Sequence, residues 1–239
     1  MKLDILVIAA HPDDAELACS GTIRKHLALG KKIGIVDLTR GELGTRGTPE
    51  IRLAESAAAT EILGIQVREN LGLADGFFQN DQASQLKLIE VIRAYRPEII
   101  FANALEDRHP DHGKGAQLAI DASFLSGLRK IDTQRDGHQQ AEWRPKQVFH
   151  YIQDRYLEPD FVIDITEHWE TKEAAIRAFR SQFFDPNSNE PASYISNPDF
   201  LDFIEARARE MGHKIGVTFG EGFQTQKTLA IQDLSSLLQ

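Results

Sequence analysis

The sequence predicts an α/β protein built on a doubly wound, mainly parallel, Rossmann-like sheet. Short runs such as residues 5–8 and 99–102 are apolar at every position, which is typical of strands buried on both faces. Segments with helical spacing separate these runs, and alternating strands and helices form parallel sheets with crossover helices. No repeat, low-complexity tract or linker interrupts the chain. We therefore expect one domain, residues 1–239, with an elaborated C-terminal part from about residue 147.

The first half of the chain alternates regularly between the two kinds of element. We expect strands at residues 5–8, 33–36, 65–71 and 99–102. The first helix spans about residues 15–29 before Gly30, and the fourth begins near Gly113. Between them, Thr48-Pro49 and Gly64 bound a second helix, and Asp81 and Pro97 bound a third. The expected packed face of the second helix consists of Ile51, Ala54, Ala58 and Ile62.

The second half is less regular. Residues 126–146 are polar without a clear period, and we expect a long surface loop there. Two strands follow at residues 148–152 and 161–165, and Thr166 is placed to cap a helix that runs to Arg180. Residues 184–198 are rich in Pro, Asn and Ser and predict a loop. A helix at 199–211 and a Gly-punctuated strand and turn at 216–223 complete the prediction.

Charge and composition narrow the class of protein. The formal net charge of -9 argues against broad binding to nucleic acid or to an anionic membrane. The one cysteine, Cys19, allows no intrachain disulfide and no Cys-rich zinc site, and it is best interpreted as a small packed thiol. No signal peptide pattern is present, and no apolar run approaches the roughly 20 residues that span a bilayer. A cytoplasmic protein is therefore expected.

Two polar clusters follow predicted strands. The stretch His11-Pro12-Asp13-Asp14 follows the first strand, and Asp107-Arg108-His109-Pro110-Asp111-His112 follows the fourth. In a doubly wound sheet the fourth strand often lies beside the first, and ligands bind outside the carboxyl ends of the strands at that point. We therefore expect both clusters to share one crevice, although nearly a hundred residues separate them.

The residue types in these clusters favour a metal site. Zinc accepts imidazole nitrogen and carboxylate oxygen, and a catalytic site keeps three protein ligands; His11, Asp14 and His112 are the expected set. Asp13 is then free to take a proton as general base. His109 can stabilise an oxyanion or protonate a leaving amine, and Asp111 can orient an imidazole. The simpler alternative is that the Asp pair only caps the next helix.

Several motifs together resemble the LmbE-like (PIG-L) family of zinc-dependent N-deacetylases. They are His11-Pro12-Asp13-Asp14 with Glu16, Gly21 and Thr22; Thr39-Arg40-Gly41-Glu42 with Arg52 and Glu55; and His109-Pro110-Asp111-His112-Gly113. Within the family, Arg68-Glu69-Asn70-Leu71, Ser181-Gln182-Phe183 and Gly220-Glu221-Gly222-Phe223 resemble the bacillithiol biosynthesis deacetylases (the BshB type). The resemblance runs from about residue 3 to residue 224.

The resemblance implies a role for individual residues. His11, Asp14 and His112 match the zinc ligands, Asp13 the general base, and His109 the histidine that stabilises the oxyanion or acts as acid. Arg52 matches a substrate-binding arginine. The implied reaction is deacetylation of N-acetylglucosaminyl malate to glucosaminyl malate, and the implied assembly is a homo-oligomer, a trimer or a hexamer. The stretch Gly44-Thr45-Arg46-Gly47 departs from the Ser-Ser-Asn-Gly type loop of this branch.

Other interpretations stay open at this point. Ferrous iron suits the same ligands as zinc. The substrate can be another N-acetylglucosamine compound, or the chain can be a non-catalytic metabolite-binding module. Arg108 pairs with Asp107 or binds an acidic substrate group, and Arg52 binds substrate or pairs with Glu55. Glu42 is a further substrate-binding candidate, Tyr194 and Glu221 are candidates for lining the crevice, and Asp37 has a capping or loop role rather than a ribose-binding one.

Overall fold

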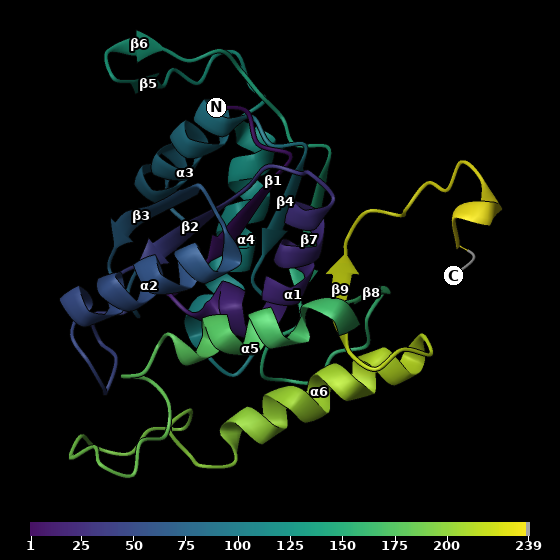
Figure 1. Cartoon of the computed structure of the whole chain (residues 1–239). Coiled ribbons are helices and arrows are strands. Elements are labelled where there is room, and N and C mark those ends of the chain that lie inside the picture. Colours follow the sequence, from purple (N-terminus) through teal and green to yellow (C-terminus); the bar gives the residue numbers. More distant parts are fainter. Residues whose placement is uncertain (238–239) are drawn as a thin grey trace.

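The computed structural model describes residues 1–237 and shows one mostly parallel seven-stranded sheet between helices (Figure 1). The strand order is β3-β2-β1-β4-β7-β9-β8. The strands are Ile5–Ala9 (β1), Ile33–Thr39 (β2), Val67–Leu73 (β3), Ile99–Ala102 (β4), Gln147–Tyr151 (β7), Phe161–Asp164 (β8) and Gly220–Thr225 (β9). β1 pairs in parallel with β2 and with β4, as the doubly wound prediction requires. The α/β fold class is confirmed.

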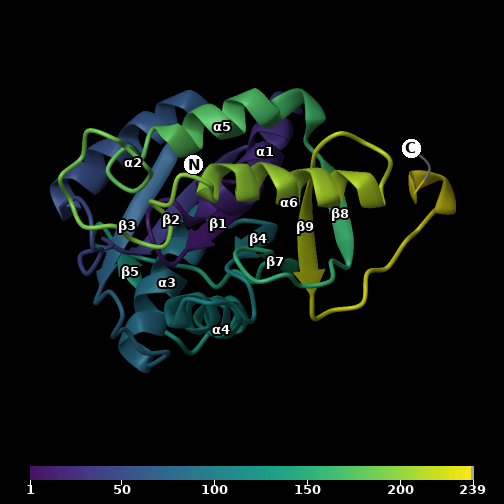
Figure 2. The ribbon, with the colours of Figure 1, turned by 90° about the horizontal axis from the view of Figure 1, so that it is seen from below.

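Helices cover both faces of the sheet. They are Asp14–Ala28 (α1), Pro49–Leu63 (α2), Gln82–Tyr95 (α3), Pro110–Leu125 (α4), Trp169–Arg177 (α5) and Phe200–Lys214 (α6), with 3-10 turns at Thr166–His168 (η1) and Leu234–Leu237 (η2). Figure 2 shows α3 and α4 on one face and α1, α2 and α5 on the other, and Figure 1 shows α6 at one end of the sheet, beyond α5. Alternate side chains of β1 accordingly enter two cores, Leu6 and Ile8 in one and Ile5 and Val7 in the other.

Capping residues fix the helix boundaries of the first half. The Thr48 hydroxyl accepts the N–H of Ile51, and Gly64 ends α2 in the left-handed conformation at φ 79°. The Asp81 carboxylate accepts the N–H of Ser84 at the start of α3. These boundaries were predicted correctly. α4, however, begins at Pro110, ahead of the expected Gly113, because Pro suits the first turn of a helix.

The predicted packed face of α2 is wrong. Ile51 and Ile62 are 45% and 40% exposed, and the buried side chains are Arg52, Ser56, Ala59 and Leu63. The inward face is partly polar because α2 supplies Arg52 to a buried ion pair next to α1. Apolar spacing alone selected the other face of the helix.

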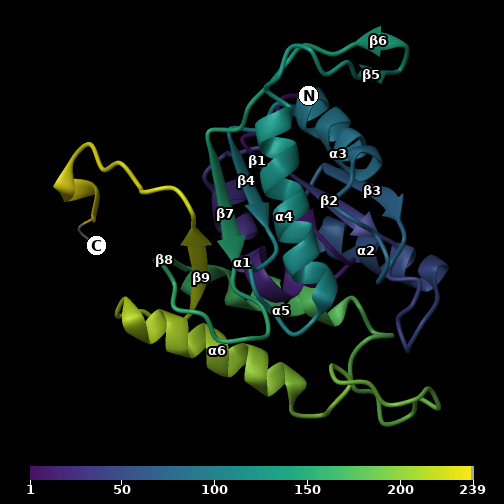
Figure 3. The same ribbon diagram turned by 180° about the vertical axis from the view of Figure 1, so that it is seen from behind.

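The region predicted as a surface loop, residues 126–146, carries a two-stranded hairpin. Gln134–Arg135 (β5) pairs with His138–Gln139 (β6), and Asp136 and Gly137 between them have φ of 52° and 76°. Positive φ at both positions suits the Asp-Gly turn of a two-residue hairpin, a signal that the lack of apolar periodicity obscured. The hairpin lies at the end of the sheet opposite α6 (Figure 3).

The structure tests the roles predicted for three further residues. Thr166 caps no helix: it begins η1, its hydroxyl accepts the N–H of Phe219, and α5 ends at Arg177. Asp37 is a buried residue inside β2 whose carboxylate binds the guanidinium of Arg68, so a capping role is wrong. Cys19 is a fully buried thiol, as predicted.

Among the described residues, none of the helices has the length and apolar character needed to cross a membrane.

Candidate active site

The two predicted clusters meet at one cavity of about 350 Å³ at the carboxyl ends of β1 and β4. Of the predicted site residues, those that line it are His11, Asp13, Asp14, Arg52, Arg108, His109 and His112. Glu42 and Asp111 do not line it. The crevice expected from the strand order is therefore present in the described part of the chain, and it is bordered by loops that follow β2, β3 and α5.

His11, Asp14 and His112 converge with the spacing of a metal site. The Asp14 carboxylate lies 3.6 Å from Nδ1 of His11 through Oδ2 and 3.1 Å from Nε2 of His112 through Oδ1. Ligand atoms about 2.0–2.1 Å from a tetrahedral zinc ion stand about 3.3 Å apart, so the two measured separations bracket that value. The residue types of this set suit zinc. Among the described residues, the groups whose ligand atoms already lie within 4.8 Å of one another are His11 with His109 and His112, and His11 with Asp75 and Asp111.

The remaining ring nitrogens of both histidines face carboxylates. Nε2 of His11 lies 3.0 Å from Oδ1 of Asp75, and Nδ1 of His112 lies 2.5 Å from Oδ2 of Asp107. Metal-binding histidines commonly donate their second N–H to a carboxylate in this way, which fixes the tautomer and the ring orientation. Burial lowers the pKa of His112, but the charge of Asp14 and the hydrogen bond to Asp107 outweigh it and raise the value to about 9.

Asp14 is held as a buried, ionised carboxylate. Oδ2 accepts the N–H of His11 at 2.9 Å and the side-chain amide of Asn103 at 3.0 Å, and Oδ1 accepts Nε2 of Gln153 at 3.1 Å. Burial would raise the pKa of Asp14, but the charge of His112 and the hydrogen bonds hold it well below its usual range. The sequence prediction missed Asn103 and Gln153, although each closely follows a strand, β4 or β7.

Asp13 does not act as a helix cap. It occupies the N-cap position of α1 at φ 125°, but its side chain makes no capping hydrogen bond. Its Oδ2 instead accepts Nη2 of Arg52 at 2.6 Å. A non-glycine residue at such a φ costs on the order of 1–3 kcal/mol, a strain found at functional sites. Burial raises the pKa of Asp13 to about 7, against the charge of Arg52, which lowers it.

Arg52 is fixed by Asp13 and by a glycine. Its Nη2 also donates to the carbonyl of Pro12 at 2.7 Å, whereas Glu55 accepts hydrogen bonds from Ser181. The alternative pairing of Arg52 with Glu55 is therefore wrong. A Cβ on Gly41 would lie 2.4 Å from Nη1 of Arg52, and Gly41 has φ +66°, so the loop crosses this guanidinium only with glycine there.

His109 presents one nitrogen to the cavity. It is the N-cap of α4, and its Nδ1 accepts the N–H of Asp111 at 3.2 Å. The ring proton is therefore on Nε2, which makes that atom a donor. Burial and the neighbouring His11 and His112 lower the pKa of His109 to about 4, so the ring is neutral near pH 7.

The remaining predicted residues differ in their relation to the site: Asp111 lies beside an imidazole, as expected, Arg108 lines the cavity, and Glu42 does not. Asp111 is fully buried 3.5 Å from Nε2 of His11, and it accepts the N–H of Gly76 and binds Lys114. Glu42 is exposed and accepts the N–H groups of Asp75 and Arg40. Arg108 does not pair with Asp107: its Nε lies 3.4 Å from Asp154, and its guanidinium lies 4.0 Å from the ring centre of Tyr194.

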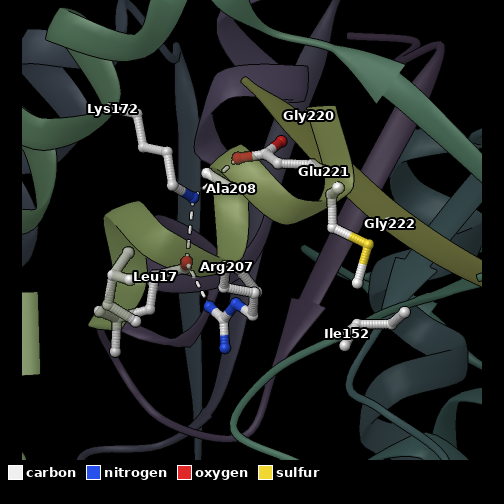
Figure 4. A pocket seen from close by; sticks show the side chains of 11 residues that line it. Leu17, Ile152, Lys172, Arg207, Ala208, Gly220, Glu221 and Gly222 are labelled. Atoms are coloured by element: carbon white, nitrogen blue, oxygen red, sulfur yellow. Dashed lines mark hydrogen bonds and ion pairs between the residues drawn. The ribbon is translucent and has the colours of Figure 1, made fainter. Parts of the chain in front are cut away.

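Glu221 lies outside the cavity and supports the helix that carries Asp14. α1 is interrupted at Cys19, with φ -137°, which frees backbone groups on both sides. The Glu221 carboxylate accepts the freed N–H groups of Gly21 and Thr22, and Lys172 donates to the carbonyls of Glu16 and Leu17. Figure 4 shows Lys172 reaching both Glu221 and Leu17. Lys172 and Glu221 also bind each other at 2.7 Å. The expectation that Glu221 lines the crevice is wrong.

Comparisons with known proteins identify relatives. Residues 6–123 match the family model PIG-L, GlcNAc-PI de-N-acetylase. The chain is 28% identical over 193 residues to diacetylchitobiose deacetylase of Thermococcus kodakarensis, covering 75% of this chain and 70% of that protein. It is 32% identical over 163 residues to the uncharacterized deacetylase YaiS of Escherichia coli, covering 64% and 84%.

Two further matches are a relative named as a hydratase and a solved structure that matches nearly the whole chain. The chain is 28% identical over 192 residues to 4-oxalmesaconate hydratase of Pseudomonas putida, covering 74% of this chain and 73% of that one. The crystal structure of the conserved protein TT1542 from Thermus thermophilus is 38% identical, with a TM-score of 0.85, and the match covers 96% of this chain and 98% of that one.

The fold, the site and these relatives define a hydrolytic enzyme that acts on amide bonds. The chain belongs to the PIG-L, or LmbE-like, family of metal-dependent deacetylases. The expected family is therefore confirmed, and a non-catalytic metabolite-binding module is not what its relatives indicate.

Proposed function

We propose that this enzyme removes the acetyl group from an N-acetylglucosaminyl conjugate, with a zinc ion held by His11, Asp14 and His112. The observation that carries the proposal is the convergence of two imidazole nitrogens on the Asp14 carboxylate, 3.6 Å and 3.1 Å away, with both rings backed by further carboxylates. Ferrous iron accepts the same ligands and is the alternative metal. The deacetylase relatives support the substrate class.

The residues around the ligands supply the proton transfers of amide hydrolysis. Zinc at this site would polarise the acetamide carbonyl and lower the pKa of a water molecule towards ~7. Asp13 takes a proton as water attacks the carbonyl carbon, and Nε2–H of His109 stabilises the developing oxyanion. The protonated Asp13, or His109, then returns a proton to the nitrogen as the C–N bond breaks. The products are acetate and a free amine.

The proposal extends to N-acetylglucosaminyl malate in bacillithiol biosynthesis. The BshB-type motifs support it, and so do the cationic residues at the cavity, because a malate group brings two carboxylates. Arg108 lies at the rim with its side chain 43% exposed. Arg46 lines the cavity within Gly44-Thr45-Arg46-Gly47, the stretch that departs from the branch, so this loop is where the aglycone is selected.

A substrate panel tests the proposal. Metal-reconstituted protein is incubated with N-acetylglucosaminyl malate, free N-acetylglucosamine and diacetylchitobiose, and the released amine is measured. Turnover of the malate conjugate well above that of the other two is expected. Equal turnover would leave the deacetylase class intact and overturn the malate assignment. An unsaturated dicarboxylate is included because one relative is a hydratase, and its hydration without any amine release would overturn deacetylation.

Assembly and location belong to the same proposal. We propose a cytoplasmic homo-oligomer, a trimer or a hexamer, as the resemblance implies. Light scattering coupled to size-exclusion chromatography measures the mass directly, and the 26.8 kDa mass of a single chain would contradict an oligomer.

A further inference from the structure

Asp75 is distinctive because both oxygens of its carboxylate have partners, and these partners lie in two different parts of the site. It follows β3 and is 5% exposed. Its Oδ1 lies 3.0 Å from Nε2 of His11, its Oδ2 accepts the N–H of Leu43 at 2.9 Å, and its own N–H donates to Glu42 at 2.9 Å. Within residues 1–237, no side chain other than that of Asp75 bonds both to a proposed metal ligand and to the 41–47 loop.

We propose that Asp75 is a positioning residue that couples the His11 ring to the 41–47 loop, so that metal binding and loop order depend on each other. The proposal rests on the metal role proposed for His11. Asp75 is not one of the proposed ligands, although it lines the cavity and its ligand atom lies within 4.8 Å of those of His11 and Asp111. It acts through the ring of His11 on one side and through the backbone of Leu43 on the other.

The 41–47 loop depends on hydrogen bonds for its position. Leu43 is 60% exposed, so apolar burial holds it weakly. The far end of the loop is tied to the 181–182 segment, since Arg46 donates to the carbonyl of Ser181 and accepts from Gln182 through its own carbonyl. Towards the near end, Gly41 donates to the Thr39 hydroxyl, and Asp75 bonds to Glu42 and Leu43. The same loop lines the cavity through Leu43, Gly44, Thr45 and Arg46.

Because one rigid carboxylate bonds to both His11 and Leu43, the position of either donor affects the hydrogen bond to the other. A metal on Nδ1 of His11 fixes the ring, and the ring N–H then fixes Oδ1 of Asp75, which orients Oδ2 towards Leu43. Coupling between two sites is reciprocal, so whatever orders the loop also strengthens metal binding by the same factor. Asp111, 3.5 Å from the same Nε2, remains as an acceptor if Asp75 is replaced, so the ring keeps a partner.

Limited trypsin digestion with and without zinc tests the coupling, because Arg40 and Arg46 flank the segment that Asp75 ties down. In the wild type, zinc is expected to slow cleavage after Arg46 several-fold. In Asp75→Asn, cleavage is expected to be fast and indifferent to zinc, and the zinc Kd to rise by roughly 10- to 100-fold. Zinc protection of Asp75→Asn equal to that of the wild type would overturn the proposal.

Two matched variants separate coupling from simple loosening. Glu42→Ala removes one tie of the loop without touching His11, so cleavage should accelerate while the zinc Kd stays within about twofold of wild type. Asp75→Glu keeps the charge but displaces both oxygens, so it should also lose the protection by zinc; retained protection counts against the coupling. Circular dichroism of each metal-free variant establishes that it folds.

The same data separate a failure of the proposed function from a failure of the proposed coupling. A wild-type protein that binds neither zinc nor ferrous iron would overturn the proposed function, and the coupling with it. A wild-type protein that binds zinc tightly but is cleaved after Arg46 at a rate independent of zinc would overturn the coupling alone.

Discussion

The carboxyl end of β1 supplies His11 to the site and that of β4 supplies His109 and His112, and the backbones of the two ends differ. After β1 the chain makes a strained turn at Asp13, with φ 125°, and α1 is interrupted at Cys19. After β4 the helix begins regularly, with His109 as N-cap and Pro110 in its first turn. The β4 end is thus specified by neighbouring residues. The β1 end depends on side chains more than 150 residues away, because Lys172 and Glu221 satisfy the interrupted helix.

The strained residue at the β1 end should give the largest effect. Asp13→Asn is expected to lower kcat by roughly 10²- to 10⁴-fold, the usual contribution of a positioned general base, while zinc content stays near wild type. The free-amine assay and metal analysis of the same sample measure the two quantities. Near wild-type turnover would sink the assignment of Asp13 as base. Loss of zinc together with activity would instead mean that Asp13 serves the metal.

The dependence of the β1 end on the C-terminal part is the next test. Lys172 and Glu221 are 2% and 3% exposed at the side chain, so Lys172→Met leaves a buried carboxylate without its charged partner. Breaking such a pair typically costs about 3–5 kcal/mol of the free energy of unfolding. Chemical denaturation of the metal-free protein measures this loss.

A matched exposed pair provides the control. Lys214 binds Glu158 at 2.9 Å on the surface, and Lys214→Met should change the denaturation midpoint little. If both variants behaved alike, the interrupted helix would not need Lys172, and the two strand ends would be equally self-contained.

The contrast also explains what the sequence could and could not predict. Thr48, Gly64 and Asp81 act through neighbouring backbone groups, so their helix boundaries were visible in the sequence. The meeting of the two clusters was visible too, since it follows from strand order alone. The roles of Glu221 and Asp75 were not, because each depends on partners far away in the chain. A polar residue soon after a strand was the one available signal for Asp75, which comes two residues after the end of β3.

The residues after β4 should make zinc binding depend on pH. The pKa of His112 is raised to about 9 by Asp14 and Asp107 against the opposing effect of burial, so the metal-free ring is protonated at neutral pH. Zinc needs a neutral nitrogen, and its binding must therefore release that proton. The proton released by His112 should make the apparent zinc affinity rise by about tenfold per pH unit, and this contribution should flatten above about pH 9.

Stability of the metal-free protein should move in the opposite direction. Because the folded pKa of His112 exceeds the ordinary value of 6.5, its contribution is fully present below pH 6.5 and is lost as the pH rises through about 9. Chemical denaturation at a series of pH values measures this loss.

The number of protons released on zinc binding tests the role of Asp107. Titration calorimetry in two buffers of different ionisation enthalpy counts these protons. Asp107→Asn removes a cause of the raised pKa of His112, so at a pH of about 8 zinc binding should release fewer protons from the variant than from the wild type. Equal release by both proteins would mean that Asp107 does not set the proton affinity of His112.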